Sequence, residues 1–291
     1  MNKKPLVSVY IPTHNRAELL SNAVKSVINQ TYKNIEIIIC NDGSGDNTDD
    51  VVNKLQKEYK DIPFVYLKND SPMGACFSRN RCIAAASGYY LTGLDDDDYF
   101  LPNRIESLIK VCNERKIDLV CSNLIFKDGN KLKRGKNNSG VITSIDMGYE
   151  NLVGNQLLTR LSYFEDVGGF DTNFPAWQDY DLWYRIIMKF GPCIKTNEAT
   201  YVMDVENDRK RISTSSKAHI GYRSFIEKHS ETLSEEMKSS LFIRDLINRN
   251  KKIPLKTLLS SGRKVASFKH NMRLCFPVVN SIAAFVREIK K

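Results

Sequence analysis

Short apolar runs alternate with stretches of helical periodicity along the first third of the chain. Runs rich in β-branched and aromatic residues cover Leu6–Ile11, Ile35–Cys40, Phe64–Leu67 and Tyr89–Leu94, and they predict four strands. The second run is almost uninterrupted by polar residues, as is typical of a strand whose two faces are both buried.

The segments between these strands carry apolar residues at helical spacing. Helices are predicted from Leu19 to Ile28, over Thr48–Tyr59 and over about Gly74–Ala86. Alternating strands and helices build a parallel sheet. The sequence therefore predicts an open α/β fold built on a parallel sheet.

Polar segments follow three of the four strands. They are Thr13–Arg16, Asn41–Ser44 and Asp95–Asp98. Because ligands of such sheets bind just beyond the carboxyl ends of the strands, we expect these segments to converge on one crevice.

The four consecutive aspartates Asp95–Asp98 carry the clearest chemical signal. Like charges at this spacing disfavour joint ionisation unless a cation lies among them. Mg²⁺ and Mn²⁺ prefer oxygen ligands and typically join one or two carboxylates to substrate phosphates. The alternative is a solvated acidic loop or a helix N-terminus, where negative charge is favourable without a metal.

Less regular patterns occupy the middle of the chain. A helix near Arg104–Cys112 and a strand near Leu119–Asn123 precede Lys127–Ser139, whose Lys, Asn and Gly residues predict a mobile surface loop. Gly168–Asp171 predicts a turn, and Asp179–Phe190 predicts a helix with an apolar inner face.

The net charge of +9 arises entirely from the C-terminal part of the chain. Residues 1–220 contain 28 basic and 28 acidic side chains, whereas residues 221–291 contain 15 and 6. A basic helical region of this kind indicates an anionic partner. Interleaved apolar residues favour an anionic membrane surface, no nucleic-acid-binding motif is found, and simple packing is the alternative.

The N-terminal sequence and the cysteine pattern indicate where in the cell the protein is located. The N-terminus lacks the composition of a signal peptide, and no apolar run reaches the roughly 18 residues of a membrane-spanning helix. Seven cysteines are scattered singly, which predicts small buried side chains rather than disulfides or zinc ligands. We therefore expect a cytoplasmic protein, peripheral at the inner face of the cytoplasmic membrane.

Two common phosphate-binding motifs are absent from the sequence. There is no Gly-x-x-x-x-Gly-Lys-[Ser/Thr] loop, and no Gly-x-Gly-x-x-Gly follows the first strand. These absences argue against kinases, ATPases and dinucleotide-dependent dehydrogenases.

Several separate motifs, taken in order, resemble the inverting family 2 glycosyltransferases of the GT-A fold, of the kind that build bacterial surface polysaccharides. The resemblance extends over roughly Val7–Arg185. The matching motifs are Val7–Arg16, Ser26–Tyr32, Glu36–Ile39, Asn41–Ser44, Ser78–Asn80, Gly88–Tyr90, Leu94–Asp98, Gly168–Asp171 and Asp179–Arg185.

The resemblance implies an α/β GT-A fold, whose open sheet is Rossmann-like and binds a nucleotide, with a helical basic C-terminal extension. Residues 1–220 would form the glycosyltransferase domain, with a nucleotide-sugar-binding half at 1–105 and an acceptor-binding half at 106–220. Residues 221–291 would form the C-terminal region.

The resemblance also implies a donor site for a UDP-sugar and a divalent metal, Mn²⁺ or Mg²⁺. Asp95 and Asp97 match the ends of the family's Asp-x-Asp motif, and Asp98 is a further candidate metal ligand. The candidate donor-binding residues are Pro12, Thr13, Asn15, Arg16, Asp42, Ser44, Arg79, Asp95 and Asp96.

Asp179 matches the family's catalytic base, although an aspartate at a helix start is also a common N-cap. An acceptor hydroxyl needs a carboxylate within hydrogen-bond reach to take its proton. One displacement then inverts the anomeric centre. Trp177 and Asp181 are candidate acceptor-binding residues; packing and a role at the helix N-terminus are the respective alternatives.

Two departures from the family pattern stand out. Gln178 occupies the position where the family often has Glu, and Val202–Arg211 contains no histidine that would serve as a metal ligand. The resemblance therefore implies one catalytic carboxylate and leaves a third metal ligand unassigned.

The predicted activity is transfer of a hexose or N-acetylhexosamine from a UDP-sugar to a saccharide acceptor, in surface polysaccharide or lipopolysaccharide biosynthesis. An acceptor carried on a lipid pyrophosphate would suit the basic C-terminal region. Two rivals remain open, namely a polyprenyl-phosphate glycosyltransferase of the same fold and a non-catalytic nucleotide-sugar-binding module.

Overall fold

The computed structural model describes residues 4–205, 216–254 and 257. They belong to two compact units. Of the described residues, the first contains 4–147, 151–173 and 178–205, and the second contains 148–150, 174–177, 216–254 and 257. These limits differ from the predicted division at 220, because two short segments and the start of a helix before 220 group with the second unit.

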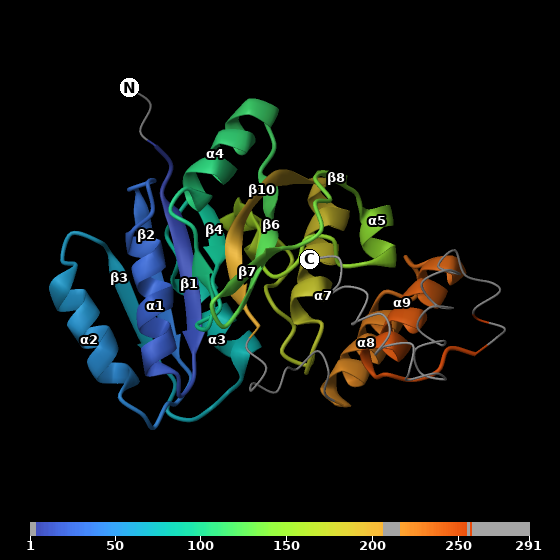
Figure 1. Cartoon of the computed structure of the whole chain (residues 1–291), viewed down its shortest axis with the longest axis horizontal. Helices are drawn as coiled ribbons and strands as arrows, with labels where there is room; N and C mark the ends of the chain where they lie inside the picture. The colour runs from blue at the N-terminus through green and yellow to red at the C-terminus, as the bar shows by residue number, and fades with distance from the viewer. Residues whose placement is uncertain (1–3, 206–215, 255–256, 258–291) are drawn as a thin grey trace, which may run out of the picture. The chain divides into compact units, whose positions relative to one another are not determined.

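One mixed sheet forms the centre of the first unit (Figure 1). The strand order is β3-β2-β1-β4-β9-β6-β10-β5, with β7 paired to β6 and β8 paired to β10. The strands are β1 (Val7–Thr13), β2 (Ile35–Asn41), β3 (Phe64–Lys68), β4 (Tyr90–Gly93), β5 (Tyr99–Phe100), β6 (Leu119–Asp128), β7 (Lys131–Arg134), β8 (Gly140–Ile142), β9 (Leu158–Arg160) and β10 (Cys193–Asp204).

The N-terminal half of this sheet is parallel, as predicted, and the remainder is mixed. β1 pairs in parallel with β2 and β4, and β2 pairs in parallel with β3. β9 is antiparallel to both β4 and β6, and β5, β7 and β8 are also antiparallel to their partners. Sequence analysis did not find β5 and β9 because they span only 2 and 3 residues, too few for periodicity to reveal.

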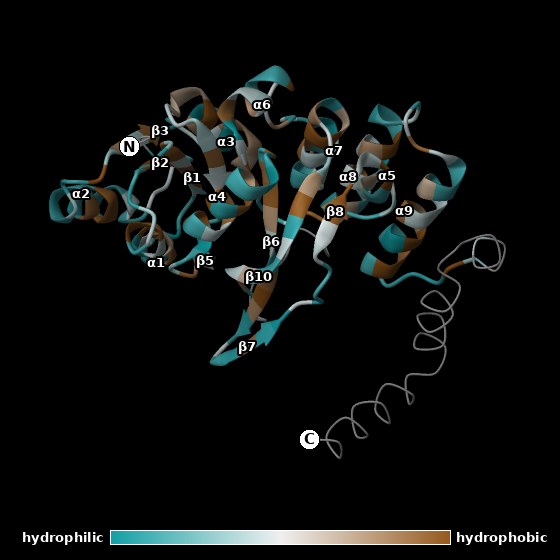
Figure 2. Ribbon diagram, turned by 90° about the horizontal axis from the view of Figure 1, so that it is seen from above, coloured by the Kyte–Doolittle hydropathy of each residue, from teal (hydrophilic) through white to brown (hydrophobic). Residues whose placement is uncertain are grey.

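Helices cover both faces of the sheet (Figure 2). α1, α2 and α4 share one apolar cluster with the side chains of β1 and β2 that point to that face. α3 packs on the other side, against β1, β2 and β3. The helices that begin in this unit are α1 (Ala17–Ile28), α2 (Thr48–Glu58), α3 (Ala75–Ala85), α4 (Arg104–Arg115), α5 (Ser144–Tyr149), α6 (Leu161–Asp166) and α7 (Gln178–Phe190).

Alternation along β1 and β2 explains the two layers. Val9 and Ile37 belong to the cluster under α1, α2 and α4, whereas the neighbouring Tyr10 and Ile38 are equally buried but lie outside that cluster. Successive side chains of a strand point to opposite faces. Both faces of these strands are therefore buried, as the continuous apolar pattern predicted.

The predicted surface loop at Lys127–Ser139 is partly a hairpin. β6 continues to Asp128 and β7 returns from Lys131, which is paired in register with Asp128. The turn between them is Gly129–Asn130, and Gly129 has φ +55°. Such two-residue turns favour glycine, but the surrounding lysines hid the strand signal.

The second unit contains α8 (Ser216–Lys228) and α9 (Glu235–Asn248). Ser234 caps α9 by accepting a hydrogen bond from the Met237 amide at 3.2 Å. The Trp177 ring lies in this unit, 5.7 Å from the rings of Tyr222 and Phe225. Most of the basic C-terminal region predicted to contact a membrane lies outside the described residues.

Two further expectations concern membrane spans and cysteines. Within the described ranges, no helix has both the length and the apolar character needed to cross a bilayer. Six cysteines in those ranges are free and buried, as predicted, and Cys275 lies outside them.

Candidate active site

Two of the predicted polar segments lie together beyond the carboxyl ends of β1 and β4. Thr13 donates a hydrogen bond to Asp96 Oδ2 at 2.8 Å. The Arg16 guanidinium contacts Asp96 Oδ1 at 2.9 Å and Asp97 Oδ2 at 3.0 Å. These bonds join the first strand's loop to the acidic cluster, because neighbouring parallel strands end at the same edge.

The third segment, after β2, joins the same group. The Asp42 amide donates to the Thr13 carbonyl at 2.8 Å, and the Asn15 amide donates to Ser44 Oγ at 2.9 Å. Pro12 is the penultimate residue of β1 and pairs in register with Cys40. All three polar segments therefore meet at one edge of the sheet.

Asp42 orders the turn that leads into α3. Its carboxylate accepts hydrogen bonds from Asn69 Nδ2 at 2.6 Å and from the Met73 and Gly74 amides at 2.8 Å each. Burial alone would raise the pKa of Asp42, but these hydrogen bonds to the charged form outweigh it and lower the pKa. The carboxylate thus fixes the segment from which Arg79 projects.

Arg79 links the acidic cluster to the start of α7. Its Nη2 donates to Asp95 Oδ1 at 2.9 Å, and its Nη1 donates to Gln178 Oε1 at 3.2 Å. The same Nη1 lies 3.6 Å from Asp179 Oδ1. The guanidinium stacks over the Phe170 ring, 5.1 Å from its centroid. One buried cation therefore contacts two carboxylates that are far apart in sequence.

Asp179 has the properties of a base that works near neutral pH. Its side chain is 27% exposed, yet among the described residues no donor reaches its buried Oδ1. Burial raises the pKa of Asp179 to about 6, while Arg79 opposes the rise and Asp95 adds to it. A carboxylate with such a pKa is ionised at neutral pH and still accepts a proton readily.

Asp98 is held from two sides by β10. Its Oδ2 accepts from the Tyr201 hydroxyl at 2.7 Å, and its Oδ1 accepts from the Asp204 amide at 2.9 Å. Burial, followed by the charges of Asp95 and Asp97, raises the pKa of Asp98 to about 8. Asp98 therefore has both oxygens engaged by the protein.

The acidic cluster fits a hard divalent cation by the chemistry of its donors. Asp95 and Asp97 remain 22% and 24% exposed, and their charges act together on Asp98, a repulsion that a cation would relieve. The part of the chain that the structure describes holds no ready-made group of three metal-ligating side chains. Mg²⁺ and Mn²⁺ sites that include substrate phosphates often use only one or two carboxylates.

Asp181 lies in the first turn of α7, two residues after Asp179, but its side chain is buried. It is 0% exposed and accepts from the Arg185 guanidinium at 2.7 and 2.9 Å. Arg185 also donates to the Val167 and Gly169 carbonyls at 2.6 and 2.8 Å. In this conformation Asp181 cannot touch an acceptor as predicted, because its carboxylate is enclosed; it positions the turn before α7 instead.

Sequence reasoning missed several neutral residues of the site. Tyr201 supports Asp98, and Asn155 donates to Asp95 Oδ2 at 3.4 Å. Asn69 supports Asp42. No local motif marks these residues, because each acts through a contact with a distant segment.

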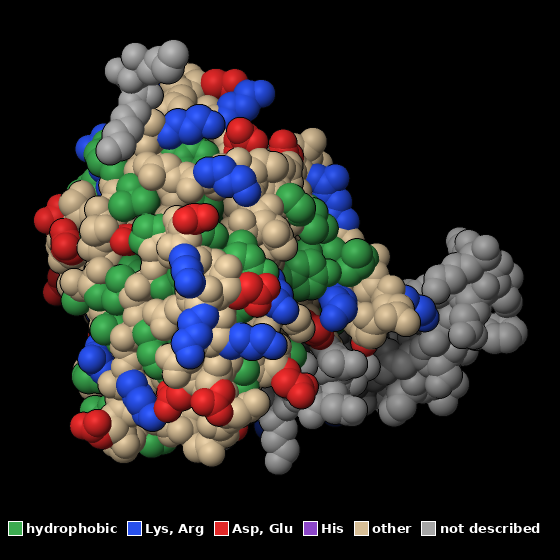
Figure 3. Space-filling view, turned by 90° about the vertical axis from the view of Figure 1, so that its left-hand side faces the viewer, with side chains coloured by type: hydrophobic (Ala, Val, Ile, Leu, Met, Phe, Trp, Pro, Cys, Tyr) green, Lys and Arg blue, Asp and Glu red, His purple; other side chains and the backbone are tan. Residues whose placement is uncertain are grey.

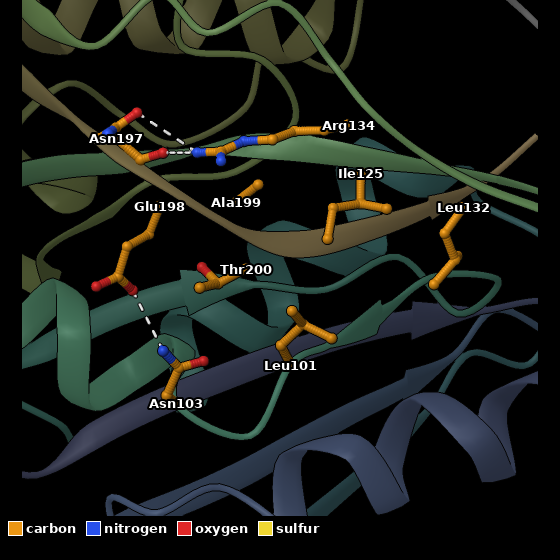
Figure 4. Close-up of a pocket in the computed structure, with 9 residues that line it drawn as sticks. All are labelled: Leu101, Asn103, Ile125, Leu132, Arg134, Asn197, Glu198, Ala199 and Thr200. Atoms are coloured by element: carbon orange, nitrogen blue, oxygen red, sulfur yellow. Dashed lines mark hydrogen bonds between the residues drawn. The ribbon is translucent and has the colours of Figure 1, made fainter.

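A separate groove of about 500 Å³ lies elsewhere on the first unit (Figure 4). Figure 4 shows Arg134 and Asn197 on one side of it and Leu101 and Asn103 on the other. None of the predicted site residues lines this groove.

Comparison with known proteins shows the family to which this chain belongs. The family described as Glycosyl transferase family 2 matches residues 8–180. The chain is 32% identical over 279 residues to WcaA of Escherichia coli (strain K12), covering 91% of this chain and 98% of WcaA. The chain belongs to glycosyl transferase family 2. The name of WcaA assigns it to colanic acid biosynthesis as a glycosyl transferase.

Two solved glycosyltransferase structures share the GT-A fold with this family member. The S. aureus TarS 1–349 complex with UDP-GlcNAc has a TM-score of 0.62 at 14% identity, covering 92% of this chain and 89% of TarS. The mannosyltransferase PcManGT from Pyrobaculum calidifontis, in complex with GDP-Man and Mn²⁺, has a TM-score of 0.66 at 15% identity, covering 100% of this chain and 82% of PcManGT. The predicted α/β GT-A fold is thereby confirmed.

Proposed function

We propose that this glycosyltransferase moves a hexose or N-acetylhexosamine from a UDP-sugar to a hydroxyl of a saccharide acceptor, with inversion at the anomeric carbon. The observation that carries the proposal is Arg79, a buried cation that joins Asp95 of the acidic cluster to Asp179. Donor and acceptor chemistry would then occur on either side of one guanidinium.

The donor side consists of the loops that meet beyond β1, β2 and β4. Asp95 and Asp97 would hold a divalent metal, Mn²⁺ or Mg²⁺, and Asp98, which Tyr201 and Asp204 of β10 hold in place, would support them. When bound, the metal supplies positive charge against the departing diphosphate. Arg16, which already pairs with Asp96 and Asp97, is suited to the diphosphate oxygens. Residues Pro12, Thr13, Asn15, Asp42 and Ser44 would border the nucleoside.

The acceptor side consists of the start of α7. The buried Asp179 Oδ1 faces Arg79 at 3.6 Å, while the side chain as a whole remains 27% exposed, so an acceptor hydroxyl would approach the carboxylate from its exposed side. The carboxylate would take the hydroxyl proton as the oxygen attacks. Arg79 would keep Asp179 ionised and in place. Asp181 would act indirectly, through Arg185.

The biological setting is part of the proposal. WcaA is named for colanic acid biosynthesis, and TarS is a structural relative seen with UDP-GlcNAc, which supports a UDP-sugar and a surface polysaccharide or lipopolysaccharide precursor. PcManGT with GDP-Man and Mn²⁺ supports the metal but shows that the nucleotide varies among relatives. The basic region after residue 220 would suit an acceptor on a lipid pyrophosphate at the inner face of the cytoplasmic membrane.

A donor screen tests this proposal. Purified protein is incubated with UDP-, GDP- and dTDP-sugars, with and without Mn²⁺, and nucleotide release is measured with and without saccharide acceptors. We expect metal-dependent release of UDP that acceptor accelerates, and a product whose anomeric configuration, read by NMR, is opposite to that of the donor. Nucleotide binding without release under every condition would favour the non-catalytic rival.

A further inference from the structure

The hairpin of β6 and β7 is a basic, exposed element of the first unit. Between residues 127 and 136 the chain carries five basic side chains and one acidic one. All four residues of β7, Lys131–Arg134, are exposed. Figure 2 shows β7 and the end of β6 extending beyond the flanking helices.

Charge alone has a simple explanation at this position. Among the described strands β7 pairs only with β6, so its other edge is free, and lysines on a free edge discourage pairing with other chains. That explanation does not account for Leu132, which stands between two lysines, lines the groove of Figure 4 and is still 60% exposed. On the face shown in Figure 3, by contrast, basic and acidic side chains are interspersed.

The hairpin stands directly beside the acidic cluster. Lys127 pairs in register with Asp204 of β10, and its Nζ lies 3.1 Å from Asp204 Oδ2. The Asp204 amide in turn donates to Asp98 Oδ1 at 2.9 Å. Two residues therefore connect the hairpin to the site where the donor diphosphate is proposed to bind.

We propose that this hairpin is a contact site for an anionic phospholipid surface. Lys131 and Lys133 extend from one face of β7 and Leu132 from the other, so the free edge of the strand would meet the lipid. Lys131, Lys133 and Lys136 would then lie among the lipid phosphates, and Leu132 would enter the boundary between head groups and acyl chains. The contact would hold the acidic cluster close to the membrane. This contact does not depend on the C-terminal region. Only the suggestion that it brings a lipid-carried acceptor to the site rests on the proposed function.

The side chains of the hairpin favour lipid over other polyanions. Recognition of single-stranded nucleic acid relies on aromatic side chains that stack on bases, and β7 has none. An exposed leucine between two lysines gains little from a fully hydrated polymer. It gains from burial in the interfacial layer of a bilayer, where long lysine side chains can still reach the phosphates.

Vesicle co-sedimentation of the full-length chain tests the electrostatic part. The probe is vesicles of phosphatidylglycerol and phosphatidylcholine, compared with phosphatidylcholine alone, at low salt. The double variant Lys131→Gln/Lys133→Gln should bind the anionic vesicles about 25-fold more weakly, since each lysine near an anionic surface contributes roughly fivefold. The matched control Lys54→Gln/Lys57→Gln removes the same charge from exposed positions of α2 and should stay within about twofold of the parent.

A reporter at Leu132 tests the insertion directly and does not depend on how strongly the C-terminal region binds. Leu132→Trp should show a blue-shifted emission, beyond that of the parent, and quenching by brominated lipids in anionic vesicles only. Equal weakening in the hairpin and control variants, an unshifted reporter, or the same shift with soluble polyphosphate would overturn the proposal. Acceptor-independent UDP release and the melting temperature should match the parent, which separates a failed lipid contact from a failed donor site.

Discussion

Arg79 gives the site its most specific feature at the scale of single residues. A buried arginine is costly unless its charge is paired, and this one meets Asp95 and comes within 3.6 Å of Asp179. Burial alone would lower the pKa of Arg79, but the two carboxylates outweigh it and raise the pKa. The guanidinium therefore stays charged while a proton moves at Asp179.

Replacement of the base is the first test at this scale. Asp179→Asn keeps the shape of the side chain but cannot take a proton, so we expect kcat for transfer to a hydroxyl acceptor to fall about 100- to 10,000-fold. KM for the donor should change little. The rates are measured as acceptor-dependent UDP release. A loss of less than threefold would instead favour a phosphate acceptor, which needs little help from a base.

The pH dependence follows from the same residue. Because burial raises the pKa of Asp179 to about 6, the active, ionised form is lost as the pH falls through about 6. The profile of kcat/KM should therefore rise with pH and level off above that value. Two charges close to Asp179 set the position of this inflection. Arg79 on α3 lowers the pKa of Asp179, and Asp95 in the acidic cluster raises it.

Arg79→Gln tests the electrostatic link between these groups. Arg79 lowers the pKa of Asp179, so its loss should move the ascending limb of the pH profile to higher pH and also lower kcat. Arg79→Lys keeps a positive charge and should shift the limb less. A purely structural arginine would lower activity without moving the inflection, and that result would contradict this role.

At the scale of elements, side chains in the first two turns of α7 hold this helix against the turn at residues 167–169. Asp181 is enclosed and pairs with Arg185, which also binds the carbonyls of Val167 and Gly169. Gly168 and Gly169 have φ values of +78° and +67°, conformations that glycine adopts readily. The contacts of Arg185 therefore join the tight turn at Gly168–Gly169 to the helix that carries Asp179.

Removing one partner of the Asp181–Arg185 ion pair should lower the free energy of unfolding. Asp181→Ala leaves the Arg185 guanidinium partly buried without its carboxylate, and we expect the free energy of unfolding to fall by about 3 kcal/mol. Urea denaturation measures the change. Asp181→Asn retains one acceptor and should cost less. Equal stability of parent and Asp181→Ala would show that the pair contributes nothing net.

At the scale of the whole molecule, ligand binding should stabilise the folded chain. A ligand that binds only the native state adds about 2.7 kcal/mol at 100 times its Kd. For a unit of this size that corresponds to a rise in Tm of roughly 5 to 10 °C. We expect UDP with Mn²⁺ to give this rise in a thermal melt and UDP alone to give less.

The control for the melt is Asp97→Asn, which keeps the size of the side chain but removes a proposed ligand. It should abolish the additional effect of Mn²⁺ and retain a small effect of UDP. If Mn²⁺ stabilises parent and variant equally, the metal binds elsewhere.

The sequence determined the local features of this protein. Apolar runs such as Ile35–Cys40 fixed buried strands, and the turn chemistry around Gly168 fixed a tight bend, because both depend on residues close together in the chain. The order of short motifs implied the family, and the family implied the fold. Asp179 and the acidic cluster were visible for the same reason.

Only the tertiary structure decided how these features meet. Arg79 and Asp179 are a hundred positions apart, and their proximity depends on how α3 and α7 are arranged around the mixed sheet. The same holds for Tyr201 on Asp98, for the short antiparallel strand β9, and for the enclosure of Asp181. Charge, burial and hydrogen bonding of a side chain are set by neighbours that sequence spacing does not reveal, and these set the pKa of the base.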